Sequence, residues 1–383
     1  MHDSPRDRRH LVVPLLVAVG LLVLLLLPLI IPSFYLFLST RILVFGLFAT
    51  AFNVVFGYAG MPSLGHAAFF GAGAYVVGLA STRTELPFPV VLLLALLVGT
   101  ALGVVFGLMN LRVRGIYLLL LTLALAQAVF GLAFTQVSIT GGDNGIFGIA
   151  REGLVPVGLP YFYWFVLGIV GVSLALMWQF MRSPVGMAIT GLRESESRLA
   201  ATGYRVGMYR VWAFAVSGAF AALAGMLDAY LVGSVSPANL AFLLSAEVVV
   251  MAILGGARYF FGPFLGAALI LGLEFYVSTF TTRWTIVLGA LYIVTALFMS
   301  DGVLGRIAHW RQRSGQRAGT ATGPGPDGSA TSSGGPVPDG VPALPAGAAL
   351  PSMSGSGPAE PTPSRSTASA RTTASARTTE PRP

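Results

Sequence analysis

The chain has 383 residues, of which 55% are hydrophobic and only 10% are charged. About a quarter of the residues in an ordinary soluble domain are charged, so the low charge here excludes a water-soluble globule and indicates a membrane protein. The chain has no cysteine, and all 23 basic residues are arginine. These two absences exclude disulfides, thiolate metal sites, cysteine nucleophiles and any chemistry that requires lysine. The scattered net charge of +8 argues against nucleic-acid binding.

Ten apolar segments are candidates for membrane-spanning helices, because a helix crosses the hydrocarbon core in about 20 residues. They lie near 11–31, 35–57, 61–80, 88–109, 115–137, 161–181, 211–233, 244–257, 261–278 and 285–300. The first apolar run is too long for a typical signal peptide and has no small-residue cleavage site after it, so we interpret it as a retained helix. The sequence therefore predicts an all-α polytopic membrane protein with about ten transmembrane helices (8–10).

The arginines between the spans predict the orientation, because cytoplasmic loops are rich in basic residues. With the N-terminus inside, 15 arginines fall on the cytoplasmic side and three, Arg83, Arg151 and Arg283, fall outside. We therefore expect both termini to be cytoplasmic. Residues 1–10 form the N-terminal segment and 11–310 the transmembrane domain. Residues 311–383 are mostly Gly, Ala, Pro, Ser and Thr, which predicts a disordered low-complexity tail.

Two loops are long enough to carry a function of their own. The outer loop at about 138–160 is rich in glycine, and the inner loop at about 182–210 carries five arginines and two glutamates. The middle of the inner loop has helical spacing, with Ala188, Leu192 and Leu199 on one face. Such a surface helix is either a solvated connector or a docking helix for a soluble partner.

Two glycine- and proline-broken segments lie at membrane depth, one in each half of the hydrophobic region. The first runs from Gly57 to Ala74 and the second from Leu254 to Ala268, and both place Phe-Phe-Gly after the break. Paired interrupted segments are a sequence indication of a transport path. The alternative is close helix packing by small residues, which explains most of the 47 glycines.

Few ionisable or amide side chains fall within the spans, and each is a candidate functional group because burying it in lipid is costly. They are Arg41, Asn53, His66, Gln127, Asp228, Glu247 and Glu274. Asn53 and His66 lie at the first break and are candidates to line a path. For Arg41, Glu247 and Glu274 we favour an interhelical hydrogen bond or a position near the interface. The sequence identifies no partner for Asp228.

Sequence motifs for enzyme chemistry are absent. There is no G-x-x-x-x-G-K-[ST] phosphate loop, no H-E-x-x-H metal motif and no specific Ser/His/Asp arrangement. We therefore expect no catalytic residue, no metal site and no cofactor, and the energy for any transport must come from elsewhere. A membrane-embedded enzyme is disfavoured for the same reason.

Five stretches resemble, in order, the permease subunits of branched-chain amino acid ATP-binding cassette (ABC) importers of the LivM type. The first joins FNVVFGYAG (52–60) to SLGHAAFFGAGAY (63–75), and the second is LRVRGIY (111–117). The third is TGGDNGI (140–146), the fourth runs from SPVG (183–186) through RESE (193–196) to Gly203, and the fifth joins LGG (254–256) to GPFLGA (262–267). The resemblance covers about 40–310, and the tail has no counterpart in the family.

The resemblance implies a transporter assembled from several subunits in the cytoplasmic membrane of a prokaryote. A homologous LivH-type permease completes the translocation path, two cytoplasmic ATPase subunits drive it, and an extracytoplasmic binding protein delivers the amino acid. The site residues that it implies fall in four groups. They are the translocation path (Asn53, Ser63, Gly65 and His66), the ATPase coupling loop (Arg193, Glu194, Glu196 and Gly203), the binding-protein-facing loop (Thr140, Gly141, Gly142, Asp143 and Asn144) and the second interrupted segment (Gly255, Gly256, Gly262 and Pro263).

The sequence departs from the family pattern at three places. Met61-Pro62 stands where a polar residue often follows the glycine, Asp143 stands where proline is common, and Arg258-Tyr259 replaces a small uncharged pair. These departures leave the substrate open, because related permeases carry urea, short amides or other amino acids. A secondary transporter that needs no ATPase is a further alternative, and it would have no need of the 182–210 loop.

Overall fold

The computed structural model describes Gly20 and residues 22–84, 86–151, 153–280, 286, 289 and 290. Nearly half of the predicted first span, most of the predicted tenth span, the N-terminal segment 1–10 and the tail 311–383 therefore lie outside the described residues. The predictions of their structure, including the disordered tail and the position of both termini, are left as predictions.

The described part is helical apart from one two-stranded ribbon. The longer helices are α2 (Ser33–Asn53), α3 (His66–Arg83), α4 (Phe88–Met109), α5 (Ile116–Thr135), α7 (Leu159–Arg182), α8 (Pro184–Glu194), α10 (Val206–Val232), α11 (Phe242–Gly255) and α12 (Gly262–Phe280). The short helices are the π-helical turn η1 (Val54–Tyr58), η2 (Asn110–Arg112), α6 (Val137–Thr140), η3 (Gly142–Asn144), α9 (Glu196–Ala201) and η4 (Pro237–Leu240). Strand β1 (Ile146–Phe147) pairs antiparallel with β2 (Ser234–Val235), with Ile146 opposite Val235.

Six of the described helices are long and apolar enough to cross a membrane. They run over 33–58, 88–112, 116–135, 159–182, 206–232 and 262–280, and each matches a predicted span. The predicted eighth span is instead α11, whose 14 residues rise about 21 Å, less than the roughly 30 Å hydrocarbon core. The predicted third span begins only at His66, because residues 59–65 are not helical.

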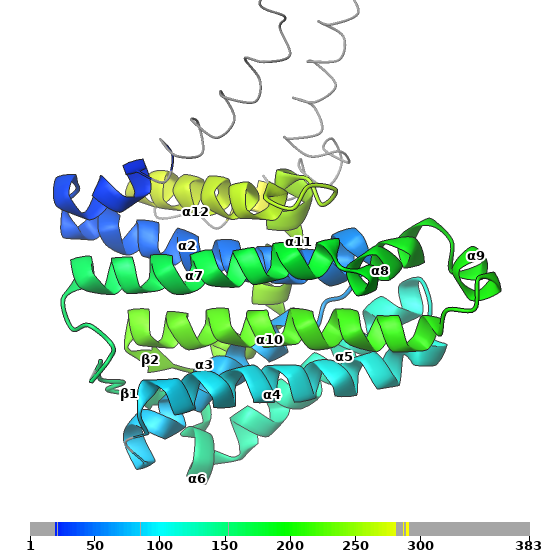
Figure 1. Cartoon of the computed structure of the whole chain (residues 1–383). Helices are drawn as coiled ribbons and strands as arrows, with labels where there is room; N and C mark the ends of the chain where they lie inside the picture. Colours follow the sequence, from blue (N-terminus) through cyan, green and yellow to red (C-terminus); the bar gives the residue numbers. More distant parts are fainter. Residues whose placement is uncertain are drawn as a thin grey trace, which may run out of the picture. The chain divides into compact units, whose positions relative to one another are not determined.

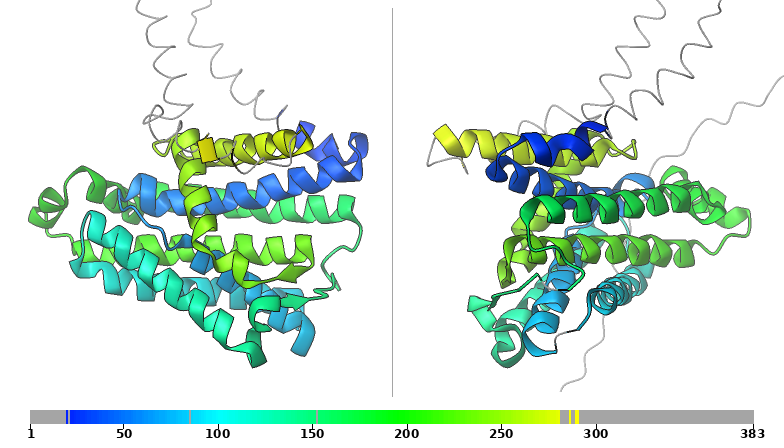
Figure 2. Two further views of the ribbon diagram at one scale, coloured as in Figure 1. Left: turned by 180° about the vertical axis from the view of Figure 1, so that it is seen from behind. Right: turned by 60° about the vertical axis from the view of Figure 1, so that its left-hand side comes forward.

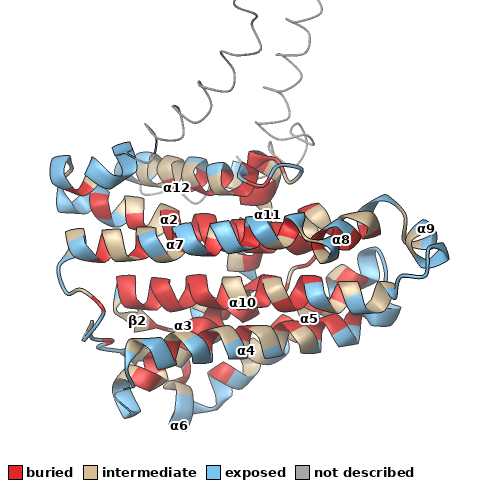
Figure 3. Ribbon diagram, in the orientation of Figure 1, coloured by how far each residue is buried: buried red, intermediate tan, exposed pale blue. Residues whose placement is uncertain are grey.

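The spanning helices α2, α4, α7, α10 and α12 lie roughly parallel in Figure 1. In the view from behind, α11 crosses them (Figure 2). Helix α10 is at the centre, in contact with α2, α3 and α4, and is buried along most of its length (Figure 3). The outward faces of α4, α5 and α7 carry exposed Leu, Val and Phe side chains, which suit contact with lipid.

Small residues allow α10 to approach its neighbours closely. On the α4 side Gly99 faces Gly218, and on the α3 side Gly225 faces the backbone of Phe70. A Cβ atom at Gly225 would overlap the carbonyl oxygen of Phe70. The small-residue interpretation of these glycines is therefore correct for the centre of the bundle.

The two long loops lie at opposite ends of the parallel helices. Figure 1 places α6, β1 and β2 at one end and α8 and α9 at the other. The predicted outer loop and inner loop thus face opposite sides, as a chain that crosses a membrane between them requires.

Candidate functional site

The first interrupted segment begins with a π-helical turn. Helix α2 changes at Val54 into η1, and after Tyr58 the chain runs without regular structure to α3. π-Helical turns are rare in proteins, and those that do occur are often found at functional sites. Gly60 has a positive φ of 69°, which glycine adopts without strain.

The backbone of this break is held by side chains from other elements. The N–H of Leu64 donates to Thr122 Oγ1 on α5 at 3.1 Å, and the N–H of Ala67 donates to Ser245 Oγ on α11 at 2.9 Å. The N–H of Gly65 donates to Ser63 Oγ at 3.2 Å. These bonds satisfy backbone groups that a broken helix leaves without partners inside the membrane.

The predicted path residue His66 lies within a closed hydrogen-bond network at the start of α3. Ser217 donates its hydroxyl proton to the carbonyl of Ala51 at 2.6 Å, so His66 Nε2 must donate to Ser217 Oγ at 2.9 Å. His66 Nδ1 then accepts from Ser63 Oγ at 3.1 Å. This arrangement fixes a neutral imidazole, protonated on Nε2, with no bond left unmade. The His66 ring is fully buried, against Phe52 and Phe69.

The second interrupted segment packs directly on the first. Gly256, with a φ of 102°, ends α11, and the chain turns through Tyr259 into α12. Asn53 Nδ2 donates to the carbonyl of Tyr259 at 3.3 Å. A Cβ atom on Gly57 would overlap both Asn53 Oδ1 and the carbonyl oxygen of Ala257. The two breaks are therefore in contact, although more than 200 residues separate them.

Within the second segment, the predicted site residues form the corner between α11 and α12. A Cβ atom on Gly255 would overlap the carbonyl of Gly262, and one on Gly262 would overlap that of Gly256. Pro263 is buried at the start of α12. Only glycine allows the two helices to meet this closely.

The inner loop folds into two short helices, each with a serine at its N-cap. Ser183 accepts from the N–H of Gly186 at the start of α8, and Ser195 accepts from that of Arg198 at the start of α9. Ala188 and Leu192 are buried, and Leu199 packs against the core. The predicted apolar stripe is therefore present, but Ser195 breaks it into two helices.

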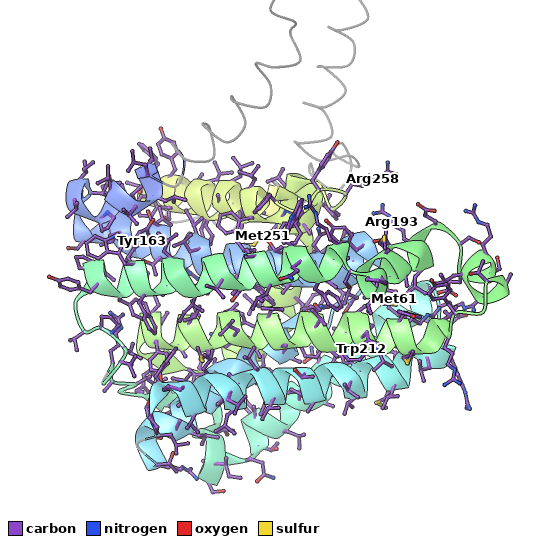
Figure 4. All side chains as sticks on the ribbon, in the orientation of Figure 1. Met61, Tyr163, Arg193, Trp212, Met251 and Arg258 are labelled. Carbon is purple, nitrogen blue, oxygen red and sulfur yellow. The ribbon has the colours of Figure 1, made fainter. Side chains whose placement is uncertain are left out.

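Arg193 joins this loop to the first break. Its Nη1 donates to the carbonyl of Gly57 in η1, and a Cβ atom on Gly60 would lie 3.1 Å from Arg193 Cβ. Figure 4 shows Arg193 beside Met61, with Arg258 of the second segment at the same end of the bundle. The two interrupted segments and the inner loop, which are far apart in the sequence, thus converge at one place.

Glu196 has a different environment from Glu194. Glu196 forms ion pairs with Arg210 on α10 and, at 3.0 Å, with Arg114. Glu194 and Gly203 are exposed, and Glu194 has no side-chain contact of this kind with the described residues.

Arg210 is the residue that sequence reasoning missed in this region. Its side chain is 3% exposed, and Nη1 donates to the carbonyls of Asn110, Leu111 and Val113 at 3.2 to 3.3 Å. The residue ties the turn between α4 and α5 to the inner loop. Only its position directly before the predicted span at 211–233 could have pointed to it.

The predicted binding-protein-facing loop lies at the opposite end and is partly exposed. Asp143 and Asn144 point to solvent, and Gly141 and Gly142 take positive φ angles of 79° and 61°. The hydroxyl of Thr140 lies 2.5 Å from the carbonyl of Ala133 and 2.9 Å from that of Gln136, to which it donates, and it accepts from the N–H of Gly142. The loop is thus a hydrogen-bonded turn that presents two polar side chains.

Arg151 fastens the outer loop to the end of α10. Its Nε and Nη2 donate to the carbonyls of Tyr230 and Leu231 at 2.7 and 2.8 Å, and its guanidinium lies 4.1 Å from the centre of the Phe162 ring. A cation at a helix C-terminus is favourable because the last carbonyls have no partner in the helix. Among the described residues, no group of three or more His, Asp or Glu side chains could hold a metal ion.

These features define a class of protein, a multi-pass membrane protein whose broken helices meet a structured loop at one end. Comparison with known proteins specifies the class further. The family model described as "Branched-chain amino acid transport system / permease component" matches residues 34–297. The chain belongs to this family, and it is the permease component of an ABC importer rather than an enzyme.

Individual relatives carry different substrates. The high-affinity branched-chain amino acid permease LivM of Escherichia coli is 31% identical over 293 residues, which cover 70% of this chain and 69% of LivM. The ribose import permease RbsC of Haemophilus influenzae is 28% identical over 246 residues, covering 61% of this chain and 74% of RbsC. A probable LivM of Methanocaldococcus jannaschii is 26% identical over 230 residues, covering 50% and 66%. No solved structure matches the chain significantly.

Proposed function

We propose that this permease imports branched-chain or closely related amino acids across the cytoplasmic membrane of a prokaryote. In this proposal a homologous permease completes the path, two cytoplasmic ATPase subunits bind the α8–α9 loop, and an extracytoplasmic binding protein docks at Asp143 and Asn144. The similarity to LivM over two thirds of both chains supports the substrate class. Neutral substrates such as urea, short amides or sugars are the alternative, since RbsC is also similar.

The contact between Arg193 and the carbonyl of Gly57 is the observation that carries the coupling mechanism. Motion of α8, driven by the ATPases, would reach η1 directly through this bond. The first break is in turn bonded to the second through Asn53 and Tyr259. A displacement at α8 would therefore act on both interrupted segments and shift the bundle between two access states.

The test uses the complete transporter in proteoliposomes with its binding protein. We expect Arg193→Ala to retain ATP hydrolysis but to lower leucine uptake per ATP about five- to a hundredfold, the range of typical coupling energies. Arg112→Ala is the matched control, because this exposed arginine on η2 lies outside the α8–α9 loop and has no side-chain hydrogen bond with the described residues. Unchanged coupling in Arg193→Ala would refute the mechanism. A wild-type transporter that takes up ribose but no amino acid would refute the substrate class, and uptake without ATPase subunits would indicate a secondary transporter.

A further inference from the structure

Four ionisable side chains gather inside the bundle, each from a different helix. Arg41 lies on α2, Asp228 on α10, Glu247 on α11 and Glu274 on α12, close enough for their charges to act on one another. Asp228 is 5% exposed. One guanidinium among three carboxylates is an unusual and costly arrangement at membrane depth.

These groups leave their bonding capacity unused among the described residues. Arg41 donates no hydrogen bond there, and its Nε and Asp228 Oδ1 are buried without a partner. Ion pairs within 4.0 Å in the described part involve only Glu196. The interhelical hydrogen bond expected for Arg41, Glu247 and Glu274 is therefore not found among these residues. Buried polar groups are normally satisfied, so Arg41 Nε and Asp228 Oδ1 are expected to have partners from outside the described residues, and for Arg41 a bound anion is one such partner.

Arg41 and Glu274 face a groove between α2 and α12 with a volume of about 390 Å³. This volume is within the range of small-molecule sites. The other walls are mainly apolar and include Phe34, Phe37 and Phe275, with the hydroxyl of Ser278 at one side. The Arg41 guanidinium also lies 5.2 Å from the centre of the Phe45 ring. The groove thus combines one cation, one anion and an aromatic surface.

We propose that this groove binds the substrate as an α-amino acid zwitterion. Arg41 binds the α-carboxylate, Glu274 binds the α-ammonium group, and the phenylalanine rings contact the branched apolar side chain. Asp228 and Glu247 lie behind and hold the positive charge of Arg41 in the membrane. A sugar or urea has no charge for either group, so the site selects amino acids over the substrates of the sugar permeases. The inference rests on the proposed function and specifies its substrate class.

The absence of cysteine in this chain makes a direct binding assay possible. We replace Ser278 by cysteine in the complete transporter and measure the rate at which a maleimide labels this subunit. L-Leucine at ten times its Kd should slow labelling about tenfold, whereas ribose and urea should not slow it. Tyr276→Cys is the matched control, because Tyr276 is 62% exposed on the same helix and lies outside the groove lining. Leucine should leave its labelling rate unchanged.

The charges are tested in the same Ser278→Cys background. Arg41→Gln and Glu274→Gln should each weaken protection by leucine about ten- to a hundredfold, the usual loss for a hydrogen bond to a charged group. 4-Methylpentanoate, which lacks the ammonium group, and 3-methylbutylamine, which lacks the carboxylate, should both protect less than leucine.

The outcomes separate this inference from the proposed function. Leucine uptake by the wild type, together with no protection of Ser278→Cys or with equal protection by ribose, would overturn the groove and leave the function intact. Normal protection in both charge variants would also overturn it. A wild type that transports no amino acid would overturn the function and the inference together.

Discussion

The ion pairs of Glu196 with Arg210 and Arg114 predict that this residue, unlike Glu194, contributes to the stability of the inner loop. Glu196→Gln removes the negative charge that Arg210 and Arg114 share but keeps the size of the side chain. Glu194→Gln makes the same chemical change two positions earlier, at an exposed side chain. The two variants therefore form a matched pair that differs only in surroundings.

The magnitude follows from the exposure of the partners. The Arg210 side chain is 3% exposed and that of Glu196 is 24% exposed, so their pair is neither fully buried nor a surface pair. A fully buried pair costs about 3–5 kcal/mol to break, and a surface pair less than about 1 kcal/mol. Arg210 also keeps its bonds to three backbone carbonyls in the variant. We therefore expect Glu196→Gln to cost about 1.5–3 kcal/mol and Glu194→Gln less than about 0.5 kcal/mol.

The assay is thermal inactivation of the purified transporter in detergent, followed by the fraction that remains monodisperse, with ATP hydrolysis measured alongside. Glu196→Gln should lose its folded fraction at a clearly lower temperature than the wild type, because the α8–α9 loop is no longer tied to α10. Glu194→Gln should match the wild type in stability. If both variants inactivate at the same temperature, the reasoning about the Arg210 pair is wrong.

Two further predictions concern the centre of the bundle. His66→Ala removes a buried ring and two hydrogen bonds, so we expect it to lower the free energy of unfolding by about 2–5 kcal/mol in the same thermal assay. Low uptake with unchanged stability would instead assign His66 to the translocation path. Gly225→Ala should prevent assembly or lower stability by more than about 3 kcal/mol, because the new methyl group overlaps the carbonyl of Phe70. The control Gly168→Ala places its methyl group in open space and should leave stability unchanged in the same thermal assay. Equal behaviour of the two variants would contradict the close packing of α3 on α10.

Hydropathy alone predicted the long helices well. The predicted spans at 88–109 and 161–181 agree with α4 and α7 to within a few residues, because about 20 consecutive apolar residues have few other stable conformations in a membrane. The same criterion failed at 244–257. There the apolar run becomes α11, a short helix that crosses the others, and apolarity cannot distinguish a buried crossing helix from a span.

The convergence of the candidate site was beyond sequence reasoning. Arg193 meets Gly57 across 136 positions, and Asn53 meets Tyr259 across 206. Each break could be recognised locally from its glycines, but their contact depends on how α2, α8 and α12 pack. Arg210 was missed for the same reason, since an arginine at the start of a span normally indicates only a membrane interface.

Helix α10 is anchored by an arginine near each end, Arg210 at one and Arg151 at the other. Its 27 residues form a rod about 40 Å long, and its close contacts with α3 and α4 resist bending. A rod of this length behaves as a lever. Tilting it by about 5° about one end moves the other by about 3.5 Å. A slight tilt of α10 at Arg210, where the inner loop is bound, would therefore move the turn at Asp143 and Asn144 on the far side by about an atomic diameter. The helix itself would not change.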